Sequence, residues 1–167
     1  MRLIVLVGTV TGTAQYVAEE IELGFSSPTL AIETHLMDGL DASVFSSDAL
    51  YLVCTSTYGQ GDVPDNARGL FNVLERERPD LSAMRYGLIG LGDRTYHDTF
   101  CFGGKRFDGL LQALGAQRIG APMWHDAASG GLAEDAAGPW MRDWLAALAD
   151  QNRLENRSDN MRSSLTP

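Results

Sequence analysis

The sequence predicts an α/β domain built on a doubly wound, five-stranded parallel sheet. Two observations support this fold class. Short apolar runs alternate with amphipathic segments along the first 150 residues, and polar loops containing glycine follow the first, third and fourth apolar runs. Alternation of this kind is typical of right-handed crossovers that place helices on both faces of a sheet. Ligands of such sheets bind beyond the carboxyl ends of the strands, so these loops are the first place to look for a site.

The predicted strands are continuous apolar runs or alternating segments. The first, third and fourth have the uninterrupted apolar character of parallel strands that are covered on both faces. The second alternates more, which indicates a less buried strand. The five predicted strands are Leu3–Val7, Thr29–Leu36, Ala49–Cys54, Tyr86–Leu91 and Arg118–Trp124.

The predicted helices carry apolar residues at helical spacing and end at glycine or proline. Gly24 and Gly115 are helix stops, and Pro79 ends the second helix. The four helices run from Gly12 to about Gly24, from Asp65 to about Arg78, from Cys101 to Leu114 and from Ala133 to Ala149. Residues 1–150 therefore form one domain, and the polar, aperiodic residues 151–167 are expected to be a disordered tail.

Composition narrows the possible functions. The chain has 13 Lys and Arg against 22 Asp and Glu, a net charge of −9, which argues against nucleic acid or an anionic membrane as partner and favours a basic protein. Two cysteines and three histidines without ligand spacing predict neither a disulfide framework nor a metal site. No apolar run approaches the ~20 residues of a membrane helix, and we expect a cytoplasmic monomer.

The first loop, Gly8–Ala14, joins an apolar strand to a helix and contains three threonines. Hydroxyls and free backbone N–H groups at a helix N-terminus suit a phosphate. The loop has neither the Gly-Lys-Ser/Thr of a Walker loop nor a GxGxxG pattern. Ordinary helix capping by Thr11 or Thr13 explains it equally well.

The second and third loops, Thr55–Asp62 and Leu91–Cys101, each supply a tyrosine, Tyr58 and Tyr96. Two aromatic side chains at the same sheet end can hold a planar ring between them. Taken alone, each loop also fits a polar turn with a surface tyrosine.

Three stretches carry a family resemblance: VGTVTGTAQYVAEEI, STYGQGDVPDNARGLF and GLIGLGDRTYHDTFCFGGKRFDGLLQALGAQRI. Together they make residues 1–150 resemble FMN-binding flavodoxins, in particular MioC-type short flavodoxins and the FMN domains of diflavin reductases. The resemblance implies a flavodoxin-like three-layer sandwich with strand order 2-1-3-4-5. It also implies FMN as cofactor.

The resemblance implies which residues hold FMN. The phosphate would lie on the first loop, the isoalloxazine between Tyr58 and Tyr96, and the carbonyl of Gly59 could turn toward the flavin N5 atom. The spacing after Tyr96 is one residue longer than usual, so Tyr96 and His97 are both candidates for the second flavin face. The full set of expected contacts is Thr9, Val10, Thr11, Gly12, Thr13, Ala14, Thr55, Ser56, Thr57, Tyr58, Gly59, Gln60, Gly61, Leu91, Gly92, Asp93, Tyr96, His97, Phe100 and Cys101.

The function implied is a one-electron shuttle between a basic NAD(P)H-dependent flavodoxin or ferredoxin reductase and an electron-acceptor enzyme. FMN carries the redox chemistry, so no catalytic side chain is expected. An alternative is an FMN-dependent NAD(P)H-quinone oxidoreductase. A flavin-free module of the same fold, such as a response-regulator receiver, lacks support because Cys54 and Thr55 stand where an acidic residue is required.

Overall fold

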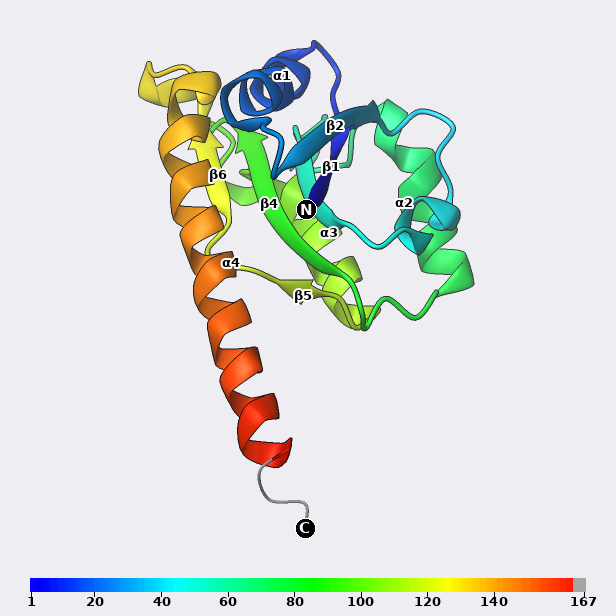
Figure 1. Cartoon of the computed structure of the whole chain (residues 1–167). Coiled ribbons are helices and arrows are strands. Elements are labelled where there is room, and N and C mark those ends of the chain that lie inside the picture. Colours follow the sequence, from blue (N-terminus) through cyan, green and yellow to red (C-terminus); the bar gives the residue numbers. More distant parts are fainter. Residues whose placement is uncertain (164–167) are drawn as a thin grey trace.

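The computed structural model describes the backbone of residues 1–163 and the side chains of residues 1–158. The chain folds into a parallel sheet of order β2-β1-β3-β4-β5 with helices on both faces, which confirms the predicted class and strand order (Figure 1). The strands are β1 (Arg2–Gly8), β2 (Ala31–Leu36), β3 (Leu50–Thr55), β4 (Arg85–Gly92), β5 (Gln117–Arg118) and β6 (Met123–Asp126). The α-helices are α1 (Thr13–Phe25), α2 (Asp65–Glu77), α3 (Phe102–Ala113) and α4 (Ala133–Ser163), and three short 3-10 turns are η1 (Ala42–Ser46), η2 (His97–Thr99) and η3 (Ala127–Ser129).

Alternating strand residues divide the core into two layers. Leu3, Val5 and Val7 of β1 face one side of the sheet, where α1 and α4 cover them. Ile4 and Leu6 face the other side, which α2 and α3 cover. Figure 1 shows these two helix pairs on opposite sides of the sheet. Because β1, β3 and β4 are buried along most of their length, they hold the loops that follow them in fixed positions.

The fifth strand position differs from the prediction. Two short strands occupy it instead of one continuous strand: β5 pairs with the start of β4 and β6 with its end. Gly120 between them has a left-handed φ of 64°, and Pro122 has no N–H to donate to a sheet. The break places β6 beside the end of β4, with Asp126 opposite Gly92.

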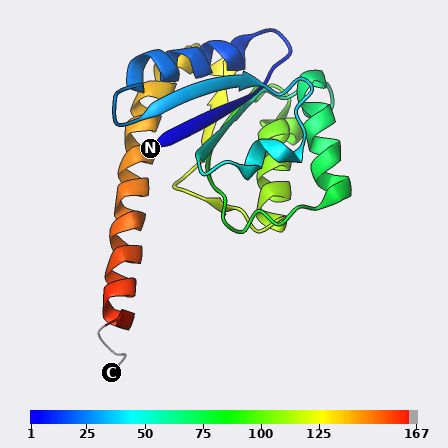
Figure 2. The ribbon, with the colours of Figure 1, turned by 45° about the vertical axis from the view of Figure 1, so that its right-hand side comes forward.

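The C-terminal region also differs from the prediction. Helix α4 continues through Ser163, where we expected a disordered tail from residue 151. Arg85 at the start of β4 donates to Asn152 at 2.6 Å, and Gln151 pairs with Glu155 one turn along. These contacts, which the sequence pattern does not reveal, tie the extension to the sheet and to itself. Figure 2 shows α4 extending past the sheet, and residues 164–167 lie outside the described part of the chain.

Candidate functional site

The carboxyl ends of the central strands border a cavity of about 730 Å³. Its lining comes from the start of α1, the loops after β3 and β4, the end of β6 and the start of α4. The lining residues are Thr13, Tyr16, Ser56, Thr57, Gly59, Gln60, Leu91, Gly92, Asp93, Tyr96, Thr99, His125, Ala127, Gly131, Leu132, Ala133 and Glu134. This volume falls within the range of small-molecule and cofactor sites.

The first loop presents backbone donors at the start of α1. Gly12 has φ 93° and no side chain caps the helix. The Gly12 N–H donates to Thr9 Oγ1 at 2.9 Å, and the Thr9 N–H donates to Asn66 Oδ1 at 2.9 Å. Within the described residues, no acceptor pairs with the N–H groups of Val10, Thr11, Thr13, Ala14 and Gln15. Free donors of this kind at a helix N-terminus bind anions such as phosphate.

The second loop is a closed turn held to its neighbours. The Tyr58 carbonyl accepts from the N–H groups of Gly61 and Asp62, and the Tyr58 N–H donates back to the Asp62 carbonyl. Gly59 and Gly61 both have positive φ, 50° and 97°. The loop leaves the Tyr58 side chain 43% exposed at the surface. A turn with glycine at these positions can reorient a peptide at low cost.

One threonine joins three elements behind this turn. The Thr57 hydroxyl donates to the carbonyl of Leu91 at 3.1 Å and accepts from the N–H of Gly103 at 3.1 Å. A Cβ on Gly103 would lie 2.4 Å from the Ser56 carbonyl oxygen. The loops after β3 and β4 and the start of α3 are therefore packed against one another with no room between their backbones.

The third loop places Tyr96 at the cavity with 67% of its side chain exposed. His97, in the η2 turn, does not line the cavity. The Phe100 ring contacts two cations: its centroid lies 4.9 Å from the Arg94 guanidinium and 5.6 Å from the Lys105 ammonium. These cation–π contacts brace the loop. Tyr96 and His97 were both candidates to cover the second face of the flavin, and of these two only Tyr96 lines the cavity.

Asp126, at the end of β6, fixes this loop from the other side. Its carboxylate accepts the N–H of Arg94 at 3.0 Å and the N–H of Ala128 at 3.0 Å. The hydrogen bond from the Arg94 backbone lowers the pKa of the Asp126 carboxyl below its usual value. A charged Asp126 therefore connects the third loop to the η3 segment that borders the cavity.

Cys101 lies beneath the site and is fully buried. Its thiol donates to the Gly90 carbonyl, and its backbone has the left-handed φ of 54°, which is rare outside glycine. Burial raises the pKa of the Cys101 thiol to about 12. The side chain therefore acts as packing and not as a nucleophile.

The structure brings together about half of the residues that the sequence predicted for the site. Nine of them line the cavity: Thr13, Ser56, Thr57, Gly59, Gln60, Leu91, Gly92, Asp93 and Tyr96. The other eleven lie in or below the loops without lining the cavity: Thr9, Val10, Thr11, Gly12, Ala14, Thr55, Tyr58, Gly61, His97, Phe100 and Cys101. Ala14, Thr55 and Cys101 are fully buried, so they support the loops from below.

Eight lining residues were absent from the prediction: Tyr16, Thr99, His125, Ala127, Gly131, Leu132, Ala133 and Glu134. Tyr16 had a usable signal, because it follows Thr13 by three residues on one helix and so shares its face. Residues 127–134 had none, since their position depends on the break between β5 and β6.

Two further properties limit the chemistry. No group of three or more His, Cys, Asp or Glu among the described residues could hold a metal ion. None of the helices in the described part is long and apolar enough to cross a membrane.

Comparison with known proteins identifies the family. The family described as Flavodoxin matches residues 5–140. Protein MioC of Escherichia coli (strain K12) is 36% identical over 146 residues, which cover 84% of this chain and 94% of MioC. NADPH-dependent diflavin oxidoreductase 1 of Cryptococcus neoformans is 34% identical over 144 residues, 84% of this chain and 23% of that protein.

A solved structure agrees with these relatives. The C101A mutant of flavodoxin from Pseudomonas aeruginosa superposes with a TM-score of 0.79 at 33% identity, covering 89% of this chain and 99% of the other. These matches confirm the resemblance that the three sequence stretches indicated. The chain belongs to the flavodoxin family, a family of FMN-binding proteins.

Proposed function

We propose that the chain binds one FMN in the cavity at the carboxyl edge of the sheet and acts as an electron carrier. The observation that supports this most strongly is the set of backbone N–H groups of Val10, Thr11, Thr13, Ala14 and Gln15, which have no acceptor among the described residues and suit the phosphate of FMN. The exposed rings of Tyr58 and Tyr96 suit a planar isoalloxazine. When bound, FMN supplies the redox chemistry.

The protein's own contribution is binding and electrostatics. Asp93 and Glu134 line the cavity, and no Lys or Arg among the described residues does. Carboxylates at this position disfavour further negative charge on a bound cofactor. Gly59 has a positive φ and nothing within 4 Å of an added Cβ, so its exposed peptide has room to adjust to the ring of a bound cofactor.

The proposed partners are a basic NAD(P)H-dependent reductase and an electron-acceptor enzyme. The net charge of −9 favours fast, weak encounters with a positively charged surface. Glu134 at the start of α4 adds negative charge at the cavity, and Asp98 adds an exposed carboxylate in the third loop.

The binding proposal is tested by isolating the protein and denaturing it. We expect a yellow protein that releases one FMN per chain. A colourless protein that takes up no added FMN overturns the proposal.

The carrier proposal is tested with NADPH, alone and with a reductase. We expect reduction of the bound flavin only when a basic reductase is added, at a rate that falls as salt rises. Rapid oxidation of NADPH by the protein alone, with a quinone as acceptor, would instead identify an NAD(P)H-quinone oxidoreductase.

A further inference from the structure

Asn66 lies in the first turn of α2, and its side chain reaches across to the end of β1. Its Oδ1 accepts the N–H of Thr9 at 2.9 Å. Its Nδ2 donates to the carbonyl of Val7 at 3.1 Å and to Asp38 Oδ2 at 3.3 Å. One half-buried side chain thus connects β1, the first loop and the segment after β2.

This arrangement requires a neutral amide. Only an amide offers an acceptor and two donors at the end of a short side chain. An aspartate would place its carboxylate against the Val7 carbonyl and the Asp38 carboxylate, and an apolar residue would leave the Thr9 N–H without its partner.

Thr9 connects Asn66 to the start of α1 through two hydrogen bonds. Its N–H is held by Asn66, and its hydroxyl accepts the N–H of Gly12. Gly12 is the left-handed residue immediately before the helix. The chain Asn66–Thr9–Gly12 therefore sets the direction in which the unpaired N–H groups of the following residues point.

We propose that Asn66 is a positioning residue for the phosphate group of the cofactor, although it does not line the cavity. It holds the first loop in the conformation that leaves those N–H groups open to an anion. This inference rests on the proposed function, because it assigns Asn66 a role in the same FMN site.

The test distinguishes the contribution of the phosphate group to binding from that of the ring. Riboflavin has the ring and ribityl chain of FMN but no phosphate. We measure the dissociation constants of FMN and riboflavin for the wild-type apoprotein and for Asn66→Ala. Loss of the bonds that orient the loop weakens FMN binding by about tenfold, while riboflavin binding changes by less than about twofold.

Two variants complete the design. Asn72→Ala replaces an exposed asparagine on the same helix and should leave both constants unchanged. Asn66→Ser keeps a hydroxyl that can hydrogen-bond to Thr9 or to Val7 but not to both. It should therefore lose less FMN affinity than Asn66→Ala. It also provides a test if the alanine variant does not fold.

The outcomes distinguish this inference from the proposed function. A wild-type protein that binds no FMN overturns the proposed function. A wild type that binds FMN, with Asn66 variants that bind it equally well, overturns only the role of Asn66. Equal weakening of FMN and riboflavin also overturns it, since a general structural role would affect both ligands alike.

Discussion

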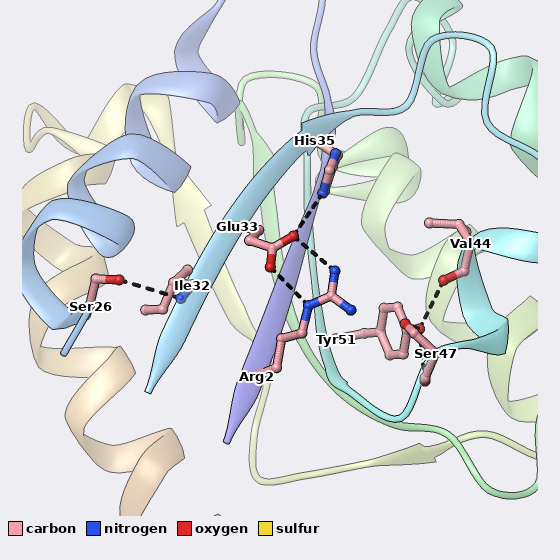
Figure 3. Close-up of polar contacts among 8 residues, drawn as sticks. All are labelled: Arg2, Ser26, Ile32, Glu33, His35, Val44, Ser47 and Tyr51. Atoms are coloured by element: carbon pink, nitrogen blue, oxygen red, sulfur yellow. Dashed lines mark hydrogen bonds and ion pairs between the residues drawn. The ribbon is translucent and has the colours of Figure 1, made fainter. Parts of the chain in front are cut away.

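The two ends of the sheet differ in how their polar groups are paired. At the amino end, Arg2 forms two hydrogen bonds of 2.9 Å with Glu33, which also contacts His35 (Figure 3). The buried Tyr51 hydroxyl contacts Ser47 and donates to the Val44 carbonyl. At the carboxyl end, the N–H groups of Val10, Thr11, Thr13, Ala14 and Gln15 have no partner in the described residues.

Left-handed backbone occurs at both ends, but at the amino end it lies at the helix ends Arg78 and Gly115. The carboxyl end carries the left-handed residues Gly12, Gly59, Gly61 and Cys101 around its cavity of about 730 Å³. The amino end has a smaller cavity of about 280 Å³ beside Tyr51. Unusual backbone and unpaired donors persist where the surrounding structure supports them and where function uses them. The comparison predicts that changes at one end affect ligand binding and that changes at the other affect only stability.

The largest effect is expected for Gly103→Ala. The new Cβ would lie 2.4 Å from the Ser56 carbonyl, so the second loop and α3 must separate. We expect the free energy of unfolding to fall by about 3 kcal/mol, with at least a tenfold loss of FMN affinity, measured by chemical denaturation and by titration of the apoprotein.

Gly109→Ala is the matched control on the same helix. Nothing lies within 4 Å of its added Cβ, so helix propensity should raise stability by about 0.5–1 kcal/mol. A Gly103→Ala protein as stable as this control would contradict the close packing of loop and helix.

A second pair of variants compares the two ends directly. Thr57→Val removes the hydroxyl that joins Leu91 and Gly103, and Tyr51→Phe removes the hydroxyl that joins Val44 and Ser47. Each should lower the free energy of unfolding by about 1–2 kcal/mol. Only Thr57→Val should weaken FMN binding, by several fold. An equal loss of FMN affinity in Tyr51→Phe would contradict the proposal that changes at the amino end affect only stability.

The smallest effect is expected from pH. The pKa values of Asp126 and Glu33 are both lowered, mainly by the hydrogen bonds from the Arg94 backbone and the Arg2 side chain. A lowered folded-state pKa contributes stability at neutral pH, which is lost as pH falls below the unfolded-state value of about 4 and through the folded one. Acidification should therefore loosen both ends.

Only Asp126 should connect this pH dependence to the ligand, since it holds the third loop. Asp126→Asn should weaken FMN binding at neutral pH by less than Thr57→Val does. It should also flatten the decline of FMN binding as pH falls below about 4. Glu33→Gln should leave the pH profile of FMN binding as in the wild type. Fluorescence titrations across this range measure both, and identical profiles for Asp126→Asn and the wild type would contradict the role of Asp126.

The sequence predicts the sheet well because its signals are local. The apolar runs that became β1, β3 and β4 and the helix faces with Val17, Leu70 and Phe107 follow directly from periodicity. The fifth strand was harder, because Gly120 and Pro122 interrupt a run that still looks apolar. The extension of α4 is joined to the sheet by Arg85, which is 67 residues from its partner Asn152.

The site was predicted in outline and missed in detail for the same reason. The three loops follow strand ends, which local pattern reveals. His125 lines the cavity because β6 pairs with β4, which brings it opposite Leu91, and Asn66 contacts the first loop through the bond from Thr9. Neither residue type nor spacing marks them in the sequence.

The most direct test of the account observes both ends of the sheet as FMN binds. Apoprotein labelled with ¹⁵N is titrated with FMN, and the backbone amide signals are followed. The account predicts saturation at one FMN per chain, with the largest shifts at Val10–Gln15, Ser56–Gly61 and Leu91–Tyr96. The amides of Arg2, Glu33 and Tyr51 should stay in place. No shift at Val10–Gln15 on saturation, or shifts concentrated at the amino end, would contradict it.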